Sequence, residues 1–418
     1  MLGSEVTNFA MTLWAWQVTG MATPLSLIIF FSHVPRIVVA FFAGVLVDRW
    51  NRKLLMMVGD TAAAISTVAI LLLFLSDRLE VWHLYVTAAV NGLFGYFQDL
   101  AYSASISVMV PPQHYTRAAA MSDHIGQFGS NIIAPAIAGV LYYAIGLKGI
   151  LTIDLITFII AISTVWGVQI PQPQIDASDR DSRNIWQDMT FGFRYMIERP
   201  SFLAISIFWL IFNFVDGVLT GIHSPVILAR SSNDAAVYAS VQSAIGLGGA
   251  IGAVVLTVWG GFKRRIHGLL LGTVLSYASM AAFGLANLPS VWIVSGFLAG
   301  VFWPLIGSSN QAIWLSKVAP EVQGRVFATR YLIAQISLPL GLGISGILAD
   351  YVFEPAMMPG GSLAEIFGGA FGTGSGSGMA LQYTLFSLVG VLIGIGGYAI
   401  RQLRDVETIV PDRDAGCV

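Results

Sequence analysis

The chain has 418 residues, of which 56% are apolar and 11% carry charge, whereas roughly a quarter of the residues in a soluble domain are charged. So little charge cannot cover the surface of a water-soluble protein of this length, and the net charge of −2 does not favour a nucleic-acid partner. Cys417 is the only cysteine, which excludes an internal disulfide and a cysteine-based metal cluster. We therefore expect a membrane protein whose main partner is the lipid bilayer.

Long apolar segments, separated by turn residues or charges, follow one another along the chain. A helix needs about 20 residues to cross a bilayer, so about twelve crossings fit this length. The segments lie at 1–19, 24–47, 54–76, 81–109, 118–146, 149–170, 202–229, 236–260, 266–287, 290–316, 326–353 and 379–400. Their apolar runs are continuous, whereas the strands of a membrane barrel alternate between apolar and polar residues. The sequence predicts an all-α membrane protein with twelve transmembrane helices.

The two halves of the chain resemble each other. Pro112 and Arg117 follow the fourth span with the same spacing as Pro320 and Arg325 after the tenth. Paired six-helix halves are typical of alternating-access transporters, so we expect two pseudo-symmetric six-helix bundles. The predicted parts are an N-terminal bundle at 1–170, a linker at 171–201, a C-terminal bundle at 202–402 and a tail at 403–418.

Two stretches outside the spans have a distinct composition. In the linker at 171–201, Trp186, Met189 and Phe193 recur among charged residues, which predicts an amphipathic helix on the inner membrane surface. Residues 354–379 are rich in Gly and Ser, which predicts a flexible loop that forms no packed domain.

The basic residues set the predicted orientation. Of the 21 Lys and Arg residues, only Arg78, Lys148 and Arg230 fall in loops that face outward if the N-terminus lies inside. Arg36 lies within a span, and the others lie at the opposite ends of the helices, as the positive-inside rule requires. We therefore expect a multi-pass protein of the cell (inner) membrane with both termini in the cytoplasm.

The loop between the second and third spans carries a specific pattern. It reads Gly44-x-x-x-Asp48-Arg49-x-x-Arg52-Lys53. Gly44 allows close helix approach, and Asp48 can accept hydrogen bonds at a helix N-terminus. The alternative is a basic turn that only sets the membrane topology, which would explain the Arg and Lys residues but not Gly44 and Asp48. The pattern resembles the signature loop of the major facilitator superfamily, which implies that the loop latches an inner gate. Asn51 stands where the family usually has Gly; asparagine tolerates the same left-handed backbone, so this departure does not weaken the resemblance.

Three further stretches read Gly3-Ser-x-x-Thr7-x-Phe9-Ala10, Gly146-Leu-x-Gly-Ile-Leu-x-x-Asp154 and Gln323-Gly-Arg325-Val-Phe327-Ala328. They resemble the drug-exporter branch of this superfamily, which contains macrolide efflux and enterobactin export proteins. Gly126, Pro135 and Gly139 in the fifth span are similar to the Gly/Pro motif of the branch's proton antiporters, with plain helix packing as the alternative. The branch implies export of a small organic compound driven by proton entry. In relatives the stretch that begins at Gly3 lies well inside the first helix, so we expect the chain to begin inside a truncated first span.

Ionisable side chains inside predicted spans are costly and indicate function. Asp216, Asp99 and Glu5 fall on spans seven, four and one, which the resemblance implies line a central cavity. A carboxyl that is protonated when buried and releases its proton when hydrated can couple transport to protons; a hydrated or hydroxyl-capped acid is the alternative. Arg36 lies at about the depth of Glu5, which allows an ion pair that is either structural or switching.

Aromatic residues dominate the predicted cavity spans. The candidate substrate contacts are Trp16, Phe94, Tyr96, Trp209, Phe212, Asn213 and Trp303. Aromatic walls with few polar anchors suit a hydrophobic or amphipathic solute, although aromatic residues are also common in helix packing.

The predicted function is proton-coupled efflux by alternating access of a drug-like, macrolide-like or siderophore-like compound. The sequence has no zinc motif, phosphate-binding loop or nucleophile elbow, so we expect no enzyme activity, no metal and no cofactor, with the proton gradient as the energy source. An importer, a lipid-type flippase and a non-transporting membrane sensor remain open alternatives. We expect a monomer whose partners are lipid, protons and a small-molecule substrate.

Overall fold

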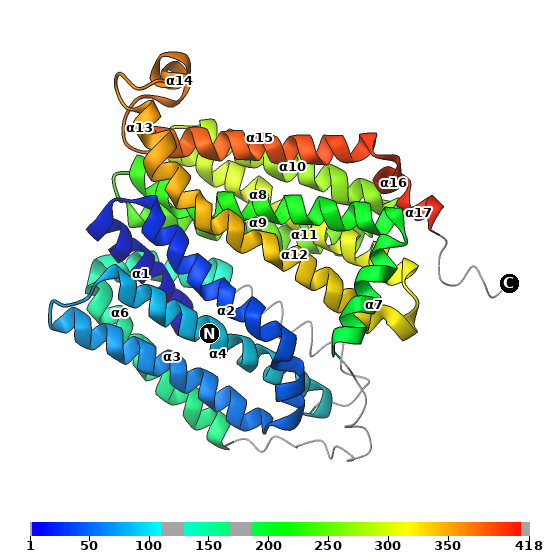
Figure 1. Cartoon of the computed structure of the whole chain (residues 1–418). Helices are drawn as coiled ribbons and strands as arrows, with labels where there is room; N and C mark the ends of the chain where they lie inside the picture. The colour runs from blue at the N-terminus through cyan, green and yellow to red at the C-terminus, as the bar shows by residue number, and fades with distance from the viewer. Residues whose placement is uncertain (1, 110–128, 168–184, 411–418) are drawn as a thin grey trace. The chain divides into compact units, whose positions relative to one another are not determined.

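The computed structural model describes residues 2–109, 129–167 and 185–410 (Figure 1). Within these ranges the chain is helical and contains no strand. Nine helices of this described part are long and apolar enough to cross a membrane, and α1 and α4 occupy two further predicted spans. The helical membrane fold is therefore confirmed, while the count of twelve spans stays a prediction.

Contacts divide the chain into two compact units. Unit 1 comprises Met1–Ile175 together with Ile227–Ser243. Its complete elements are α1 (Leu2–Thr19), α2 (Ala22–Arg49), α3 (Arg52–Leu75), α4 (Val81–Met109), the short π-helix η2 (Gly129–Ile133) and α6 (Ala134–Gly167). α2 and α3 both pack against α4, and α6 packs against α1 and α3 (Figure 1).

The long helix α6 contains two of the predicted spans. It covers 34 residues, but Gly146 interrupts it with φ 64 and ψ −174. Glycine adopts this left-handed backbone without the steric penalty of a Cβ atom, so it breaks the helix here. The break falls where the predicted fifth span ends, and the second arm of α6 corresponds to the predicted sixth span.

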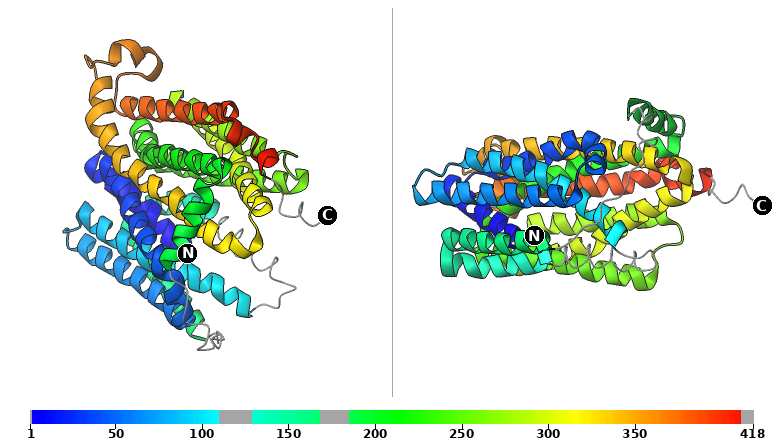
Figure 2. Two further views of the ribbon diagram at one scale, coloured as in Figure 1. Left: turned by 45° about the vertical axis from the view of Figure 1, so that its right-hand side comes forward. Right: turned by 90° about the horizontal axis from the view of Figure 1, so that it is seen from below.

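Unit 2 comprises Asp176–Val226 and Ala244–Val418. Its elements are α7 (Ile185–Ile197), most of α8 (Pro200–Arg230), most of α9 (Ala235–Trp259), α10 (Arg265–Leu285), α11 (Pro289–Lys317), α12 (Pro320–Leu348), η4 (Ala349–Phe353), α13 (Glu354–Met357), α14 (Ala364–Phe371), α15 (Ser377–Ala399), α16 (Arg401–Arg404) and α17 (Val406–Ile409). α10 packs against α11 and α15, and the views of Figure 2 show these helices running alongside one another.

The two units repeat the same neighbour relations. In unit 1, α3 packs against α4 and α6; in unit 2, α10 packs against α11 and α15. These are the third, fourth and sixth predicted spans and their counterparts six spans later. The repetition agrees with the paired halves expected from the sequence. The predicted boundaries of the linker and tail stay predictions.

Close helix crossings also recur in both units, and glycine makes them possible. A Cβ atom at Gly92 of α4 would overlap the backbone carbonyl of Ser32 in α2. A Cβ atom at Gly248 of α9 would likewise overlap the carbonyl of Phe297 in α11. Small residues at such points let two helix backbones approach and gain van der Waals contact, which is a main source of helix association in lipid.

We expect Gly92→Ala to lower the thermal midpoint of the purified protein, because the new methyl group must push α4 away from α2. Overpacking costs about 1–3 kcal/mol, more than the roughly 1 kcal/mol that alanine gains over glycine in helix propensity. Gly95→Ala is the matched control, since Gly95 lies one turn further along α4 and faces open space. Fluorescence-detected size-exclusion chromatography after heating measures both midpoints. A midpoint for Gly92→Ala equal to or above that of Gly95→Ala contradicts the crossing.

A helix, α7, lies within the predicted linker and packs against α12, while its place on the inner membrane surface stays a prediction. A Cβ atom at Gly192 would overlap the side chain of Thr329, so the two helices touch closely. The guanidinium of Arg325 lies 4.2 Å from the centre of the Phe191 ring. This cation–π contact and the glycine contact fasten the linker helix to unit 2.

The prediction of a flexible loop at 354–379 is wrong. The segment contains α13 and α14, and both pack against α15. Glu354 is buried, and its carboxylate accepts hydrogen bonds from the backbone N–H groups of Gly376, at 3.2 Å, and Met379, at 2.8 Å. An acidic group at a helix N-terminus satisfies free N–H groups and interacts well with the helix dipole. The glycines serve tight turns here, which composition alone does not distinguish from flexibility.

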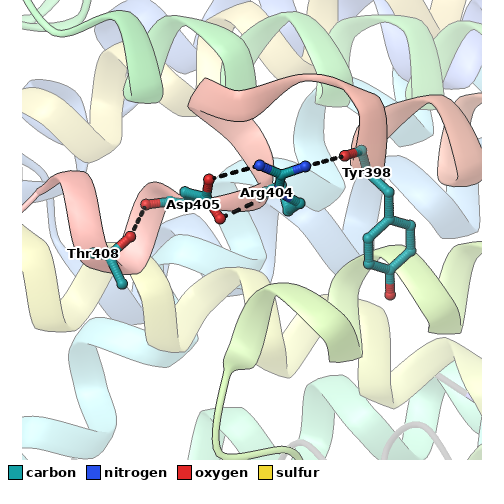
Figure 3. A network of polar contacts seen from close by, with 4 residues as sticks. All are labelled: Tyr398, Arg404, Asp405 and Thr408. Atoms are coloured by element: carbon teal, nitrogen blue, oxygen red, sulfur yellow. Dashed lines mark hydrogen bonds and ion pairs between the residues drawn. The ribbon is translucent and has the colours of Figure 1, made fainter.

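The start of the predicted tail forms two short helices with their own polar network, shown in Figure 3. Arg404 donates to the carboxylate of Asp405 at 2.9 Å and to the carbonyl of Tyr398 at 3.4 Å. The Thr408 hydroxyl donates to the Asp405 carbonyl at 2.8 Å. The hydrogen bond from Arg404 lowers the pKa of Asp405, and the same contact raises the pKa of Arg404.

This segment also fastens the adjoining ends of two long helices. The ammonium of Lys317, at the end of α11, donates to the carbonyls of Glu407, at 2.7 Å, and Val410, at 2.6 Å. The Glu407 carboxylate accepts from the backbone N–H of Ile266, at the start of α10, at 3.1 Å. The carboxylate and the ammonium thus satisfy backbone groups that helix ends leave unpaired.

Candidate functional site

Five side chains form one stripe along α8, which we name the polar stripe. Its members are Trp209, Asn213, Asp216, Thr220 and His223. Their spacing of three or four residues places them on one face of the helix. None of them is fully buried, whereas the neighbouring side chains Phe212, Val215 and Leu219 are buried in the packing of unit 2. The stripe is therefore only partly covered by helix packing, and His223 at one end of it contacts Tyr383 of α15.

Asp216 is the acidic member of the polar stripe. In the described part of the chain its carboxylate takes part in no hydrogen bond or ion pair, and its charge acts on the phenols of Tyr277 in α10 and Tyr383 in α15. The Tyr383 hydroxyl lies 3.0 Å from Nδ1 of His223, two turns along α8. The sequence placed Asp216 within a span but did not identify its phenolic neighbours, which lie on distant helices.

An aromatic cluster lies beside Asp216 in unit 2. The Phe212 ring centre is 4.8 Å from that of Trp209, 5.4 Å from Tyr277 and 5.7 Å from Trp303. Three of the predicted substrate contacts, Trp209, Phe212 and Trp303, therefore meet in space. Such a cluster offers a rigid apolar wall with the positive ring edges and negative ring faces that aromatic ligands use.

Polar atoms border this aromatic wall. The Asn213 amide donates to the carbonyl of Trp209 at 2.7 Å, which leaves its side-chain oxygen as an acceptor. The indole nitrogen of Trp209 is buried and has no hydrogen-bond partner among the described residues. An unpaired buried donor is costly, and a ligand with a carbonyl, ether or hydroxyl oxygen can satisfy it. The site can therefore orient an amphipathic solute.

The charged candidates of unit 1 also meet. Arg36 of α2 forms an ion pair with Asp99 of α4 at 3.1 Å, with both side chains partly exposed. This corrects the ion pair considered between Arg36 and Glu5, although the charge of Arg36 also acts on Glu5. Equal depth on two helices does not fix their rotation, and α2 packs mainly against α4 rather than against α1.

A further carboxylate of unit 1 escaped the sequence analysis. Asp60 of α3 accepts a hydrogen bond from the Gln98 amide of α4 at 2.7 Å. Gln98 directly precedes Asp99 in α4, so neighbouring residues of this helix contact an acid of α3 and a base of α2. Asp60 lies in the predicted third span, and the rule that intramembrane charges indicate function would have found it.

The signature loop can be placed in part. Gly44, Asp48 and Arg49 belong to the last turns of α2, and their side chains lie outside the described part of the structure. Asn51 does not use the left-handed backbone that asparagine tolerates: its φ is −65° and its side chain accepts from the N–H of Leu54 at 3.1 Å. Asparagine is a preferred N-cap, so the residue that replaces the usual glycine starts α3.

The basic end of the loop is tied to α6. Arg52 is buried, and Lys53 donates to the carbonyl of Trp166 at 2.7 Å. A lysine that binds the last carbonyls of a helix satisfies unpaired acceptors and complements the helix dipole. The gate role of the loop stays a prediction.

The structure describes two of the three residues of the fifth-span motif. Gly126 lies outside the described ranges, and Pro135 is buried at the start of α6 directly after η2. A Cβ atom at Gly139 would lie 2.7 Å from the Cβ atom of Ala239. Gly139 therefore brings α6 into close contact with the start of α9, which belongs to unit 1 by its contacts.

Residues 227–243, which we name the α8–α9 segment, dock onto α1 and α6 within unit 1. The indole N–H of Trp16 donates to the side-chain oxygen of Asn233, and the ring of Phe9 stacks on Tyr238 with centres 4.6 Å apart. Trp16 is buried by this docking, so it does not lie open to a ligand in this structure.

The α8–α9 segment also forms hydrogen bonds with α6 and η2. The Tyr143 hydroxyl donates to Asp234 at 3.4 Å and accepts from the N–H of Ala235 at 3.2 Å, and Ser243 donates to the carbonyl of Ile132 at 3.1 Å. Sequence reasoning missed these partners. Asn233 and Asp234 precede a helix and are typical turn and N-cap residues, but that local signal does not reveal what they touch.

Two further substrate candidates belong to the other unit. Phe94 and Tyr96 are half-buried on α4 of unit 1, whereas the cluster belongs to unit 2. The described ranges contain no group of His, Cys, Asp and Glu side chains that could hold a metal ion. The site therefore offers aromatic surface, a few polar anchors and isolated carboxylates.

Comparison with known proteins gives a consistent result. The family model of the Major Facilitator Superfamily matches residues 1–342. Macrolide efflux protein A of Streptococcus pyogenes is 27% identical over 359 residues, which cover 84% of this chain and 87% of that protein. Multidrug efflux pump Tap of Mycolicibacterium fortuitum is 23% identical over 364 residues, covering 83% and 86%. Enterobactin exporter EntS of Shigella flexneri is 23% identical over 380 residues, covering 89% and 82%.

Solved structures show the same fold. A bacterial homologue of the human lysosomal transporter Spinster, in an inward-facing and unoccupied conformation, superposes with a TM-score of 0.67 at 15% identity, covering 97% of this chain and 95% of that chain. The nucleoside transporter NupG superposes with a TM-score of 0.66 at 13% identity, covering 95% and 99%.

Proposed function

The chain belongs to the Major Facilitator Superfamily and is a transporter rather than an enzyme, and from this premise we propose that it exports a small hydrophobic or amphipathic organic compound in exchange for protons. The relatives named above are efflux pumps for macrolides, for multiple drugs and for enterobactin, which supports the direction of transport. The cargo of this chain is a drug-like, macrolide-like or siderophore-like compound that the aromatic cluster can accommodate.

The observation that carries the proposal is Asp216 on the polar stripe. This carboxylate lies beside the cluster formed by Trp209, Phe212 and Trp303 and takes part in no ion pair in the described part of the chain. A transporter must make proton and solute occupancy depend on each other, and a carboxyl group next to the solute site can do so directly. When a solute covers Asp216, the charged form loses water; when the solute leaves, water returns and favours the charged form.

Alternating access also requires contacts that can break and re-form during the transport cycle. The α8–α9 segment has contacts of this kind. In the orientation given by the basic residues, the turn between α8 and α9 lies on the outer side of the membrane. Its contacts through Trp16, Tyr143 and Tyr238 lie within unit 1, and alternating access in this proposal requires them to separate in the other state. The contacts are a few hydrogen bonds and one stacked pair, which a conformational equilibrium can break.

The protein acts in this proposal as a monomer of the cell (inner) membrane with both termini in the cytoplasm. The excess of Lys and Arg at one set of helix ends supports this orientation. No cofactor is involved, because the proton gradient supplies the driving force.

Transport by inside-out membrane vesicles tests the proposal. Vesicles that contain the chain should accumulate radiolabelled erythromycin or fluorescent ethidium when their lumen is acidified, because the luminal side corresponds to the outside of the cell. Nigericin, which collapses the pH gradient, should release the solute, and vesicles without the chain serve as the control. If the solute stays in the vesicles after nigericin is added, the proposal of proton coupling is overturned. Accumulation only by right-side-out vesicles would indicate an importer, and movement of fluorescent phospholipid alone would indicate a flippase.

A further inference from the structure

Among the described residues, an arginine in α12 lacks the acidic partner that a buried charge normally has. Arg330 lies eight residues beyond the start of the candidate span Val322–Met357, which corresponds to about 12 Å along the helix. Its Nη2 donates to the side-chain oxygen of Gln311 in α11 at 2.8 Å. Its Nη1 is buried and has no hydrogen-bond partner among the described residues. The guanidinium is thus only partly satisfied.

The remaining neighbours of Arg330 are aromatic. The guanidinium carbon lies 5.4 Å from the ring centre of Trp314 and 5.2 Å from that of Phe327. Ring faces attract a cation but accept no strong hydrogen bond from its N–H groups. An intramembrane arginine ordinarily pairs with an acid or with backbone carbonyls, so the free N–H group of Arg330 calls for a different explanation.

Among the side chains that the structure describes, no acid of unit 2 forms an ion pair with Arg330. In the part of the chain that the structure describes, Glu198 pairs with Arg194, Asp405 pairs with Arg404, and Glu354 binds the start of α15. Other basic side chains near these helix ends bind backbone carbonyls instead. Arg265 donates to Ala312, and Lys317 donates to Glu407 and Val410. Hydrogen bonds to backbone carbonyls therefore give Arg265 and Lys317 a structural role, but they do not account for Arg330.

The surroundings hold the guanidinium in a fixed position. Trp314 is fully buried, its indole donates to Asn310 at 3.1 Å, and its ring stacks on Phe202 with centres 4.8 Å apart. Gln311 lies on the same helix as Trp314 and fixes one side of the guanidinium fork. A donor held in place before a ligand arrives loses little conformational entropy on binding, which favours recognition.

We propose that Arg330, positioned by Gln311 and Trp314, binds the anionic group of a ligand. The chemistry required is a carboxylate, an acidic phenolate or a phosphate, because these groups accept the two parallel N–H bonds that a guanidinium offers. The ligand is an acidic amphipathic solute whose apolar part suits the aromatic surroundings. The site rests on the proposed export function only in that the ligand is taken to be an acidic member of the proposed cargo class; anion binding itself requires no proton coupling.

Binding of a simple acid and its neutral amide tests the site. The full-length protein is purified into phosphatidylcholine nanodiscs and titrated with 2-naphthoate or 2-naphthamide, whose fluorescence reports binding. We expect saturable binding of the acid and at least tenfold weaker binding of the amide. Arg330→Gln should weaken naphthoate binding at least tenfold, whereas Arg330→Lys, which keeps the charge but loses the fork, should weaken it less.

Arg325→Gln is the matched control, because it removes the same charge from the same helix five residues earlier. We expect it to bind naphthoate as the unchanged protein does. Equal affinity for acid and amide, no binding of the acid at millimolar concentration, or equal losses in both glutamine variants would overturn the proposal. Nanodiscs that contain phosphatidylglycerol distinguish the sources: competition with naphthoate assigns the site to a lipid phosphate, and its absence assigns the site to a solute.

Arg330→Met separates binding from folding. Removal of a poorly compensated charge from a membrane span relieves its desolvation, so we expect the thermal midpoint of this variant to be unchanged or higher. Naphthoate binding should nevertheless be lost. A large fall in the midpoint of Arg330→Met, together with normal naphthoate binding by Arg330→Gln, would assign the arginine to structure. The erythromycin transport assay is independent, so failure of proton-driven export would leave a positive binding result intact.

Discussion

Asp216→Asn should reduce proton-driven accumulation of erythromycin in inside-out vesicles by more than tenfold, to the level of vesicles without the chain. Asparagine keeps the shape and polarity of the side chain but cannot bind and release a proton. The polar stripe and the cluster around Phe212 remain, so the variant should still bind solute. Exchange of labelled for unlabelled solute across the membrane, measured without a pH gradient, should therefore persist and shows that the variant is folded and mobile.

Two controls accompany this experiment. Asp350→Asn makes the same chemical change in η4 of unit 2, which is not part of the polar stripe, and should leave accumulation unchanged. Asp216→Glu retains a carboxyl group and should retain part of the activity. If Asp216→Asn accumulates erythromycin normally and nigericin still releases it, the coupling site lies elsewhere. Asp99 and Glu5 of unit 1 are then the next candidates, together with Asp60, which accepts a hydrogen bond from Gln98.

A disulfide between positions 139 and 239 should abolish transport reversibly. The Cβ position at Gly139 lies 2.7 Å from the Cβ atom of Ala239, and disulfides join Cβ atoms about 3.5–4.5 Å apart, so a slight separation of α6 and α9 suffices. The bond would hold the α8–α9 segment on unit 1. If that segment must leave α1 and α6 during each cycle, copper-phenanthroline oxidation of Gly139→Cys/Ala239→Cys should reduce accumulation to background, and dithiothreitol should restore it.

The chain contains a single cysteine, so few substitutions are needed to exclude unintended disulfides. Cys417 is the only native cysteine, and it can be replaced by serine in the background protein. Each single cysteine variant should transport with or without the oxidant. Mass spectrometry of the linked peptides measures the extent of crosslinking. Full transport by a fully crosslinked protein would show that the α8–α9 segment stays docked throughout the cycle and is no gate.

The sequence predicted the features that depend on composition along one chain. Apolar length alone places the helices, because each must span a bilayer of fixed thickness. The break between the fifth and sixth spans was found within a few residues, since Gly146 adopts a backbone that glycine favours. The similarity of the two halves was also visible in the sequence. In the structure, α10 packs against α11 and α15 as α3 packs against α4 and α6.

The sequence did not predict which side chains meet. Arg36 and Glu5 lie at similar depth, yet Arg36 pairs with Asp99, because the rotation of α2 and its crossing with α4 decide the partner. Asn51 caps α3 rather than turning with a left-handed backbone, since its side chain can satisfy a free N–H that glycine could not. The Gly-rich stretch before α15 is folded because Glu354, distant in sequence, caps that helix.

What the sequence determined by itself is the membrane, the helices, the paired halves and the resemblance to a transporter family. These follow from hydropathy, charge and local motifs, which act along the chain. What only the tertiary structure decided is the chemistry of the sites: the phenols of Tyr277 and Tyr383 beside Asp216, the docking of the α8–α9 segment, and the incompletely paired Arg330. Helix rotation and crossing set these contacts, and both are properties of packed helices that no single segment encodes.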